Sequence, residues 1–202
     1  MRLLLIVFFL LVSNISVGAS DVVGTIDEFY KSLNTLEGNF VQKSTIKELK
    51  KTTTYNGRFY MKKGSLHIRY LGDKPHHVYI NNNEMIIYKP SDKTAFKMPF
   101  DESKYGQTPL SLLGGLTDIR SDFNIKRLSD KKVSLTPVKG IGQIVNVEIT
   151  VDDNKPFPID TINMIDNSGN KIEVVFKDVV VNGKVDSKVF RFVPPEGTTI
   201  LQ

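Results

Sequence analysis

The chain has 202 residues, of which 40% are hydrophobic and 24% are charged, and its formal net charge is +5. It contains no cysteine, which excludes a disulfide framework, thiolate catalysis, cysteine-ligated zinc and a lipid anchor on the chain itself. The lysines are dispersed and interleaved with acidic residues, whereas nucleic-acid binding concentrates positive charge among aromatics. We therefore expect no nucleic-acid partner.

The N-terminus has the pattern of a secretory signal peptide. Arg2 supplies a positive charge, residues 3–12 form an unbroken apolar run, and Val17-Gly18-Ala19 resembles a cleavage site. The apolar run is shorter than the roughly 20 residues that span a bilayer, which argues against a permanent anchor. We expect residues 1–19 to be removed after Ala19, leaving one exported domain over residues 20–202 that works in the periplasm.

The first mature segment predicts an amphipathic helix. Apolar side chains recur at helical spacing, and polar side chains occupy the other side. The apolar positions are Val22, Val23, Ile26, Phe29, Tyr30, Leu33 and Leu36.

Beyond Gly38 the hydrophobic period changes to two, which is typical of β-strands. Short alternating segments are separated by turn-forming residues, and no βαβ rhythm is present, so the pattern predicts an antiparallel meander. The predicted strands include residues 40–43, 53–61, 66–70, 77–80, 84–88, 145–151 and 172–176.

A short apolar helix is predicted at residues 108–116, where Thr108 is the N-cap, Pro109 opens the first turn, and Gly114-Gly115 ends the helix. Two helices beside so many strands favour one curled sheet with helices laid across its apolar face. Periodicity alone leaves a packed sandwich of two sheets equally open.

We find no catalytic constellation in the sequence. The histidines are His67, His76 and His77, none in a metal-binding spacing, and adjacent histidines in a strand point to opposite faces. Most carboxylates lie at turns, as in Asp152-Asp153, or beside lysines, although the geometry of a glycosidase pair cannot be read from sequence. We therefore expect no enzyme activity, no metal and no cofactor.

Several blocks of sequence resemble the LolA family of outer-membrane lipoprotein carriers, in order and over essentially the whole mature chain. Family elements are written in one-letter code, with x for any residue. The blocks are Phe40-Val41-Gln42 (family F-x-Q), Gly57-Arg58-Phe59 (G-x-F), residues 62–70 (R-P-G-x-F-R-W-x-Y), Tyr88-Lys89-Pro90 (Y-x-P), residues 108–113 (T-P-x-x-L-L), Leu135-Thr136-Pro137 (L-x-P), residues 166–170 (D-x-x-G-N) and residues 190–197 (F-x-F-x-P-P-x-G).

This resemblance implies a mainly β fold with a few α-helices. The expected architecture is an unclosed antiparallel β-barrel of about ten or eleven strands, whose concave apolar face is covered by a helical lid. It also implies a monomeric carrier that receives acylated lipoproteins from an ATP-driven inner-membrane complex and gives them to an outer-membrane acceptor. The alternatives are a lipid-binding periplasmic regulator or scaffold with the same half-barrel, and a secreted hydrolase.

The resemblance also locates a candidate lipid-binding cavity and a latch for the lid. Lysines stand where the family has an Arg-Pro pair, and the spacing leaves open whether Lys62 or Lys63 takes the arginine's place. Because lysine lacks the fixed fork of guanidinium donors, a weaker latch is expected. The cavity residues expected from the sheet and lid are Phe59, Met61, Leu66, Ile68, Ile86, Tyr88, Leu110, Leu112 and Leu113.

Overall fold

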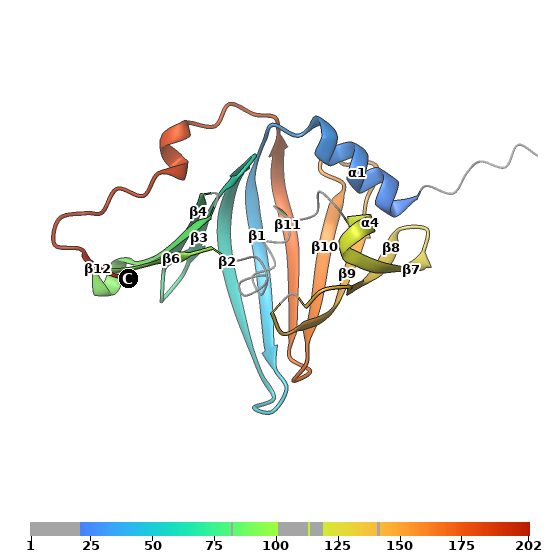
Figure 1. The fold of residues 1–202 in the computed structure, drawn as a ribbon, viewed down its shortest axis with the longest axis horizontal. Helices are drawn as coiled ribbons and strands as arrows, with labels where there is room; N and C mark the ends of the chain where they lie inside the picture. Colours follow the sequence, from blue (N-terminus) through green and yellow to red (C-terminus); the bar gives the residue numbers. More distant parts are fainter. Residues whose placement is uncertain (1–20, 82, 101–112, 114–118, 141) are drawn as a thin grey trace, which may run out of the picture.

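The computed structural model describes residues 21–81, 83–100, 113, 119–140 and 142–202, and the structural statements below concern these residues. Twelve strands form one sheet in the order β12-β6-β5-β4-β3-β2-β1-β11-β10-β9-β8-β7 (Figure 1). The strands are β1 (Thr35–Ile46), β2 (Lys51–Lys62), β3 (Ser65–Leu71), β4 (His76–Asn81), β5 (Glu84–Lys89), β6 (Thr94–Pro99), β7 (Phe123–Ser129), β8 (Lys132–Pro137), β9 (Ile144–Val151), β10 (Ile159–Asp166), β11 (Lys171–Val181) and β12 (Thr199–Leu201).

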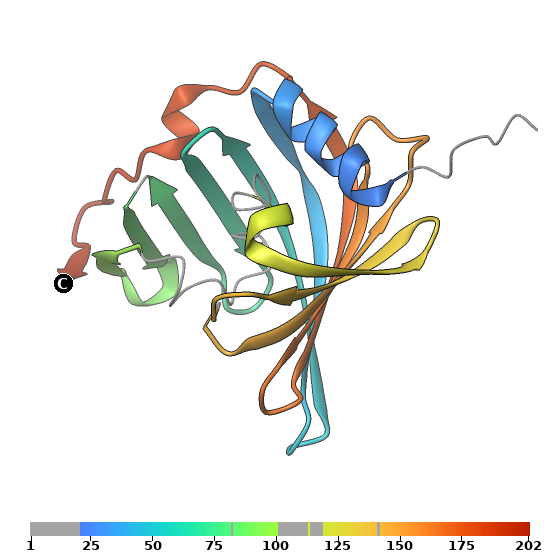
Figure 2. The same ribbon diagram turned by 45° about the vertical axis from the view of Figure 1, so that its right-hand side comes forward.

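The sheet is curled but not closed. Neighbouring strands are antiparallel except β12, which pairs with β6 in parallel, and within the described chain β12 and β7 lie at opposite ends of the sheet. The helices α1 (Val22–Ser32) and α4 (Ile119–Asp122) lie on its inner side (Figure 2). This architecture confirms the expected mainly β, unclosed half-barrel, with one or two more strands than predicted.

Helix α1 ends earlier than its hydrophobic period indicates. Its N-cap, Asp21, accepts a hydrogen bond from the Val23 N–H, but the last helical residue is Ser32 and Leu36 already belongs to β1. At its end, the Asn182 amide accepts from the Asn34 N–H and donates to the Ser32 carbonyl, at 2.7 and 3.0 Å. Within the described residues, no helix is both long and apolar enough to cross a bilayer.

At the centre of the inner face, three strands meet through one aromatic contact. The Phe40 ring on β1 lies against Gly57 on β2, where an added Cβ would sit 2.3 Å from the Phe40 Cζ atom. The Tyr70 ring on β3 meets the Phe40 ring edge to face, with ring centres 5.3 Å apart, and its hydroxyl donates to the Gln42 Oε1 atom at 3.3 Å. Position 57 of β2 must therefore be glycine, because a side chain there would occupy the space of the Phe40 ring.

The outer face of β2 to β5 carries a row of stacked aromatic rings. His67 lies between Tyr60 and Tyr79, with ring centres 5.7 and 4.0 Å away, and its Nε2 atom is 3.2 Å from the Nδ1 atom of His77. Burial lowers the pKa of His67 to about 4, and the nearby His77 and Arg69 contribute to the shift.

The C-terminal segment covers this row. It contains the 3-10 helix η3 (Ser187–Phe190), whose Phe190 carbonyl accepts a hydrogen bond from the Asn81 side chain at 2.9 Å. The Phe192 ring then lies against Tyr79 and Tyr88, and the segment ends in β12 beside β6. The last residues of the chain thus cover part of the outer face beside β4 and β5 and pair with β6.

Replacing Gly57 with alanine is expected to lower the free energy of unfolding by about 1–3 kcal/mol, because the new methyl group collides with Phe40. Gly140 is the matched control, since a Cβ there meets no atom within 4 Å. Urea unfolding of G57A and G140A checks the prediction. Equal stability of the two variants would contradict the packing account.

Protonation of His67 is expected to destabilise the protein in acid. The unfolded chain takes up a proton near pH 6.5, whereas the folded chain resists it until about pH 4, so stability falls as the pH is lowered through that window. In His67→Phe, which keeps an aromatic ring in the stack, part of this acid sensitivity should disappear. Urea titrations of both proteins from pH 7 to pH 4 measure it, and parallel curves would show that His67 is not responsible.

Candidate functional site

The inner face of the sheet is the candidate site. The strand registers place one continuous set of buried apolar side chains on this face, from β5 on one side, through β9, to Val133 and Leu135 of β8 on the other. Among the described residues, Gln42 is the single buried polar side chain there. The apolar members are Leu36, Phe40, Phe59, Met61, Leu66, Ile68, Val78, Ile80, Met85, Val133, Leu135, Val147, Ile149, Ile162, Met164, Val174 and Phe176.

Four of the six cavity residues predicted on strands lie on this inner face: Phe59, Met61, Leu66 and Ile68. Leu113, predicted on the lid, is helical, fully buried and part of the same core. Leu110 and Leu112 lie outside the described residues. The four predicted strand residues on this face thus come from β2 and β3.

Ile86 and Tyr88 lie on the opposite face, so the structure corrects their prediction as cavity residues. Ile86 is paired with Tyr79, and the Tyr88 ring lies 5.2 Å from the Phe192 ring of the C-terminal segment. Their neighbours Met85 and Ile87 face inward instead. All four positions are apolar or aromatic, so β5 has no alternation from which its inner face could be read.

The two lysines predicted as a lid latch lie at the edge of the β2–β3 hairpin. Lys62 is on the outer face, where its ammonium group lies 4.8 Å from the centre of the Phe190 ring. Lys63 is exposed in the turn. The predicted lid, residues 108–116, lies outside the described residues except for Leu113. What the structure does place beside Lys62 is the C-terminal segment.

An arginine that sequence reasoning missed joins the two helices on the inner side. Arg120 on α4 donates from Nη2 to Asp21 at 2.7 Å and from Nε to Asp27 at 3.1 Å, so one guanidinium holds both the N-cap and the second turn of α1. The hydrogen bond from Arg120 lowers the pKa of Asp21 below its usual value. Arg120 is 93 positions from Asp27 and 99 from Asp21 in sequence, and no local pattern marks them as its partners.

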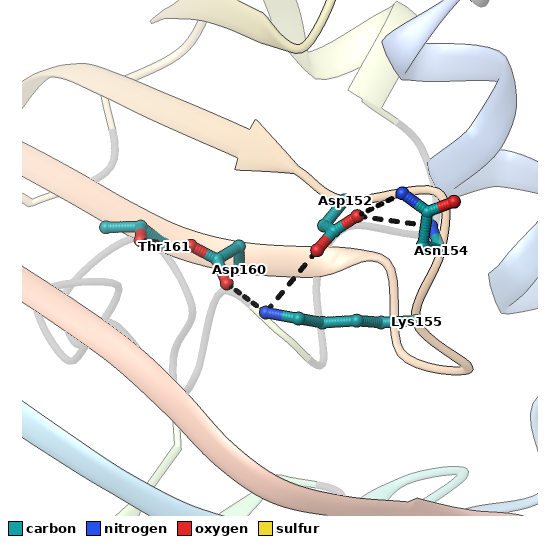
Figure 3. Close-up of polar contacts among 5 residues, drawn as sticks. All are labelled: Asp152, Asn154, Lys155, Asp160 and Thr161. Carbon is teal, nitrogen blue, oxygen red and sulfur yellow. Dashed lines mark hydrogen bonds and ion pairs between the residues drawn. The ribbon is translucent and has the colours of Figure 1, made fainter.

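A polar cluster follows β9, at the turn where the sequence placed Asp152 (Figure 3). The Lys155 ammonium lies 2.5 Å from Asp160 and 3.6 Å from Asp152. Asp152 also accepts hydrogen bonds from Asn154, which lower its pKa. Since each carboxylate is held by a turn partner and exposed to water, this cluster stabilises a turn and has no feature of a buried acid-base pair.

A polar hollow of about 630 Å³ lies between β1, β11, β10 and β9 on the outer face. Its carboxylates Glu173 and Glu148 are paired with Lys43 and Lys132, at 3.3 and 2.6 Å. An acyl chain gains nothing from such a lining, because burial of apolar surface drives its binding. The inner face is therefore the better site for an apolar ligand.

Comparison with known sequences identifies relatives of this chain. The model of the family described as "Outer membrane lipoprotein carrier protein LolA" matches residues 31–193. The chain is 26% identical over 171 residues to an outer-membrane lipoprotein carrier protein of Pseudoalteromonas translucida, covering 84% of this chain and 81% of that one. A carrier protein of the same name from Ralstonia nicotianae is 25% identical over 198 residues, covering 93% and 90%.

Solved structures agree on the fold. A LolA superfamily protein from Nitrosomonas europaea aligns with a TM-score of 0.51 at 12% identity, covering 88% of this chain and 99% of that one. An uncharacterised conserved protein from Thermus thermophilus aligns with a TM-score of 0.54 at 11% identity, covering 89% and 96%. With the family model spanning most of the chain and the open half-barrel in place, the chain belongs to the LolA family of outer membrane lipoprotein carrier proteins.

Proposed function

We infer that this chain is a periplasmic carrier that holds the acyl chains of lipoproteins against the inner face of its half-barrel and delivers them to the outer membrane. The observation that carries this proposal is the continuous apolar inner face, on which Gln42 is the single buried polar side chain among the described residues. A surface of this kind suits hydrocarbon and offers no set of groups to position a polar substrate. Membership of a family of carriers, rather than enzymes, points the same way.

The physical need for such a carrier follows from the cargo. Burying an acyl chain is worth roughly 0.8 kcal/mol per CH₂ group, so a lipoprotein with two or three chains cannot cross water unescorted. In this proposal, acyl chains enter by displacing α1 and α4 from the inner face. The closed form must then be only a few kcal/mol more stable than the open one, since a carrier also has to release its cargo.

The proposed pathway has three stages, which are export of the carrier, loading with cargo and delivery of the cargo. The signal peptide over residues 1–19 is cleaved after Ala19 and the mature domain, residues 20–202, works in the periplasm. An ATP-driven inner-membrane complex loads the carrier, and an outer-membrane acceptor lipoprotein receives the cargo. The names of the relatives support lipoprotein as the cargo class, while the loading and accepting partners are part of the proposal.

The two neighbours Ile87 and Ile86 offer a matched test of the inner face. Both are half-buried in β5, but Ile87 packs against the inner core and Ile86 faces outward. Ile87→Glu should abolish binding of a fluorescent triacylated lipopeptide, because it places a carboxylate among the acyl chains. Ile86→Glu should bind it as the unchanged protein does, as measured by fluorescence anisotropy.

Thermal unfolding of both variants controls for loss of the fold. Equal binding by two folded variants would contradict the inner face as the acyl site. A protein that bound no lipopeptide at all, but captured a periplasmic protein without acyl chains, would instead be a scaffold with the same fold.

Arg120 is expected to hold α1 and α4 together over the inner face until cargo enters. Arg120→Gln should speed exchange of bound lipopeptide severalfold, since it removes both ion pairs to α1, while Asp21 stays exposed to water and Asp27 stays half-buried. Arg127→Gln is the control, because Arg127 pairs with Asp130 within the β7–β8 hairpin and not with an acid of α1. Stopped-flow displacement measures the rates, and identical rates for the two variants would show that the arginine is no latch.

A further inference from the structure

Two hairpins project together beyond the rest of the sheet. The β1–β2 hairpin and the β10–β11 hairpin extend side by side past the ends of the other strands (Figures 1 and 2). Residues 46–51 form the apex of the longer hairpin. We call residues 46–51 the tip.

The tip combines exposed apolar side chains with positive charge. Leu49 is 66% exposed and Ile46 is 44% exposed, although a single exposed apolar residue is ordinary on a protein surface. Here three lysines, Lys47, Lys50 and Lys51, surround them against one acid, Glu48. A leucine at the apex of a basic projection fits a surface that is apolar beneath and anionic on top.

The backbone of the tip is also held in an unfavourable conformation at a lysine. Lys50 has a φ of +48°, in the left-handed region that glycine or asparagine adopts at less cost, and its N–H donates to the Lys47 carbonyl to close the turn. Glycine or asparagine at position 50 would relieve the backbone strain but would also remove a positive charge from the apex. The strained residue is therefore one that contributes to the basic surface.

The neighbouring hairpin supports the tip through a hydrogen bond and a side-chain contact. Asp166 accepts hydrogen bonds from the N–H groups of Ser168 and Asn170, which orders the β10–β11 turn. The Asn170 side chain in turn accepts from the Lys47 N–H at 3.0 Å, and the stem of Lys47 lies across Gly169. Because the tip is already ordered by these contacts, Leu49 can meet a flat surface without the entropy loss of ordering a loop.

We propose that the tip docks the protein on anionic phospholipid bilayers, with Leu49 inserted among the headgroups and the surrounding lysines in contact with lipid phosphates. The shape supports a membrane over a protein partner, because a projecting apex can touch a flat surface, whereas protein interfaces need a broad complementary patch. Docking at one point leaves the inner face free. The interaction is weak and reversible, as one inserted side chain and a few lysines provide it.

The test uses the absence of tryptophan from the chain, so a single introduced indole reports alone. Leu49→Trp places the indole at the tip. Val193→Trp is the matched control, since Val193 is 70% exposed but lies on the C-terminal segment. Each variant is mixed with phosphatidylcholine vesicles, with and without phosphatidylglycerol, and with vesicles containing brominated acyl chains.

With anionic vesicles, the L49W emission should move to shorter wavelength and be quenched by brominated chains, while V193W emission stays unchanged. Replacing Lys47, Lys50 and Lys51 by glutamine in the L49W background should weaken partition about fivefold per lysine. Sedimentation of the unmodified chain and of Leu49→Ser with the same vesicles gives a readout independent of the indole, with L49S less bound.

Three outcomes would overturn the proposal: no shift in L49W, an equal shift in V193W, or partition that ignores the loss of the lysines. A tip that recognises a protein gives the first of these. Because no acylated cargo is present in the vesicle assay, its result is separate from that of the lipopeptide assay. The thermal unfolding midpoint of L49W should match that of the unchanged chain, since the tip lies outside the core.

Discussion

The contact between Phe40 and Gly57 organises the centre of this molecule. A ring from β1 occupies the space where β2 has no side chain, and Tyr70 from β3 closes over it with a hydrogen bond to Gln42. Three separate blocks of the family pattern, F-x-Q, G-x-F and the final tyrosine of the third block, meet at this one place. These blocks are thus connected by a single packing arrangement, which lies at the centre of the apolar inner face.

The local sequence predicted the class of fold and most strands, because alternation within a strand depends on that strand alone. It failed where a distant residue decides the outcome. Helix α1 ends at Ser32 because Asn182 binds its last turn, and nothing near Leu33 or Leu36 indicates this. Ile86 and Tyr88 were assigned to the wrong face because the outer side of β5 is also apolar, buried beneath the C-terminal segment.

Distant partners also decide how α1 is linked to α4. The family resemblance directed attention to Lys62 and Lys63, whereas the structure places Lys62 against Phe190 on the outer face and gives the link between helices to Arg120. In the sequence, Asp21 and Asp27 look like ordinary polar residues of an amphipathic helix. Only the folded structure places Arg120 of α4 beside them. A link made of one exposed arginine, the exposed Asp21 and the half-buried Asp27 is weak, and under the proposed function a weak link suits a cover that must open for each cargo.

The order of strands in the sheet has a consequence for folding kinetics. The strands that meet at its centre, β1 and β11, are paired through residues as distant as Phe40 and Phe176, so the middle of the sheet is closed by the part of the chain that is synthesised late. Such non-local pairing carries a high contact order and folds slowly. Until β11 arrives, β1 presents an open edge beside its apolar face, and the nascent half-sheet is exposed to aggregation during that interval.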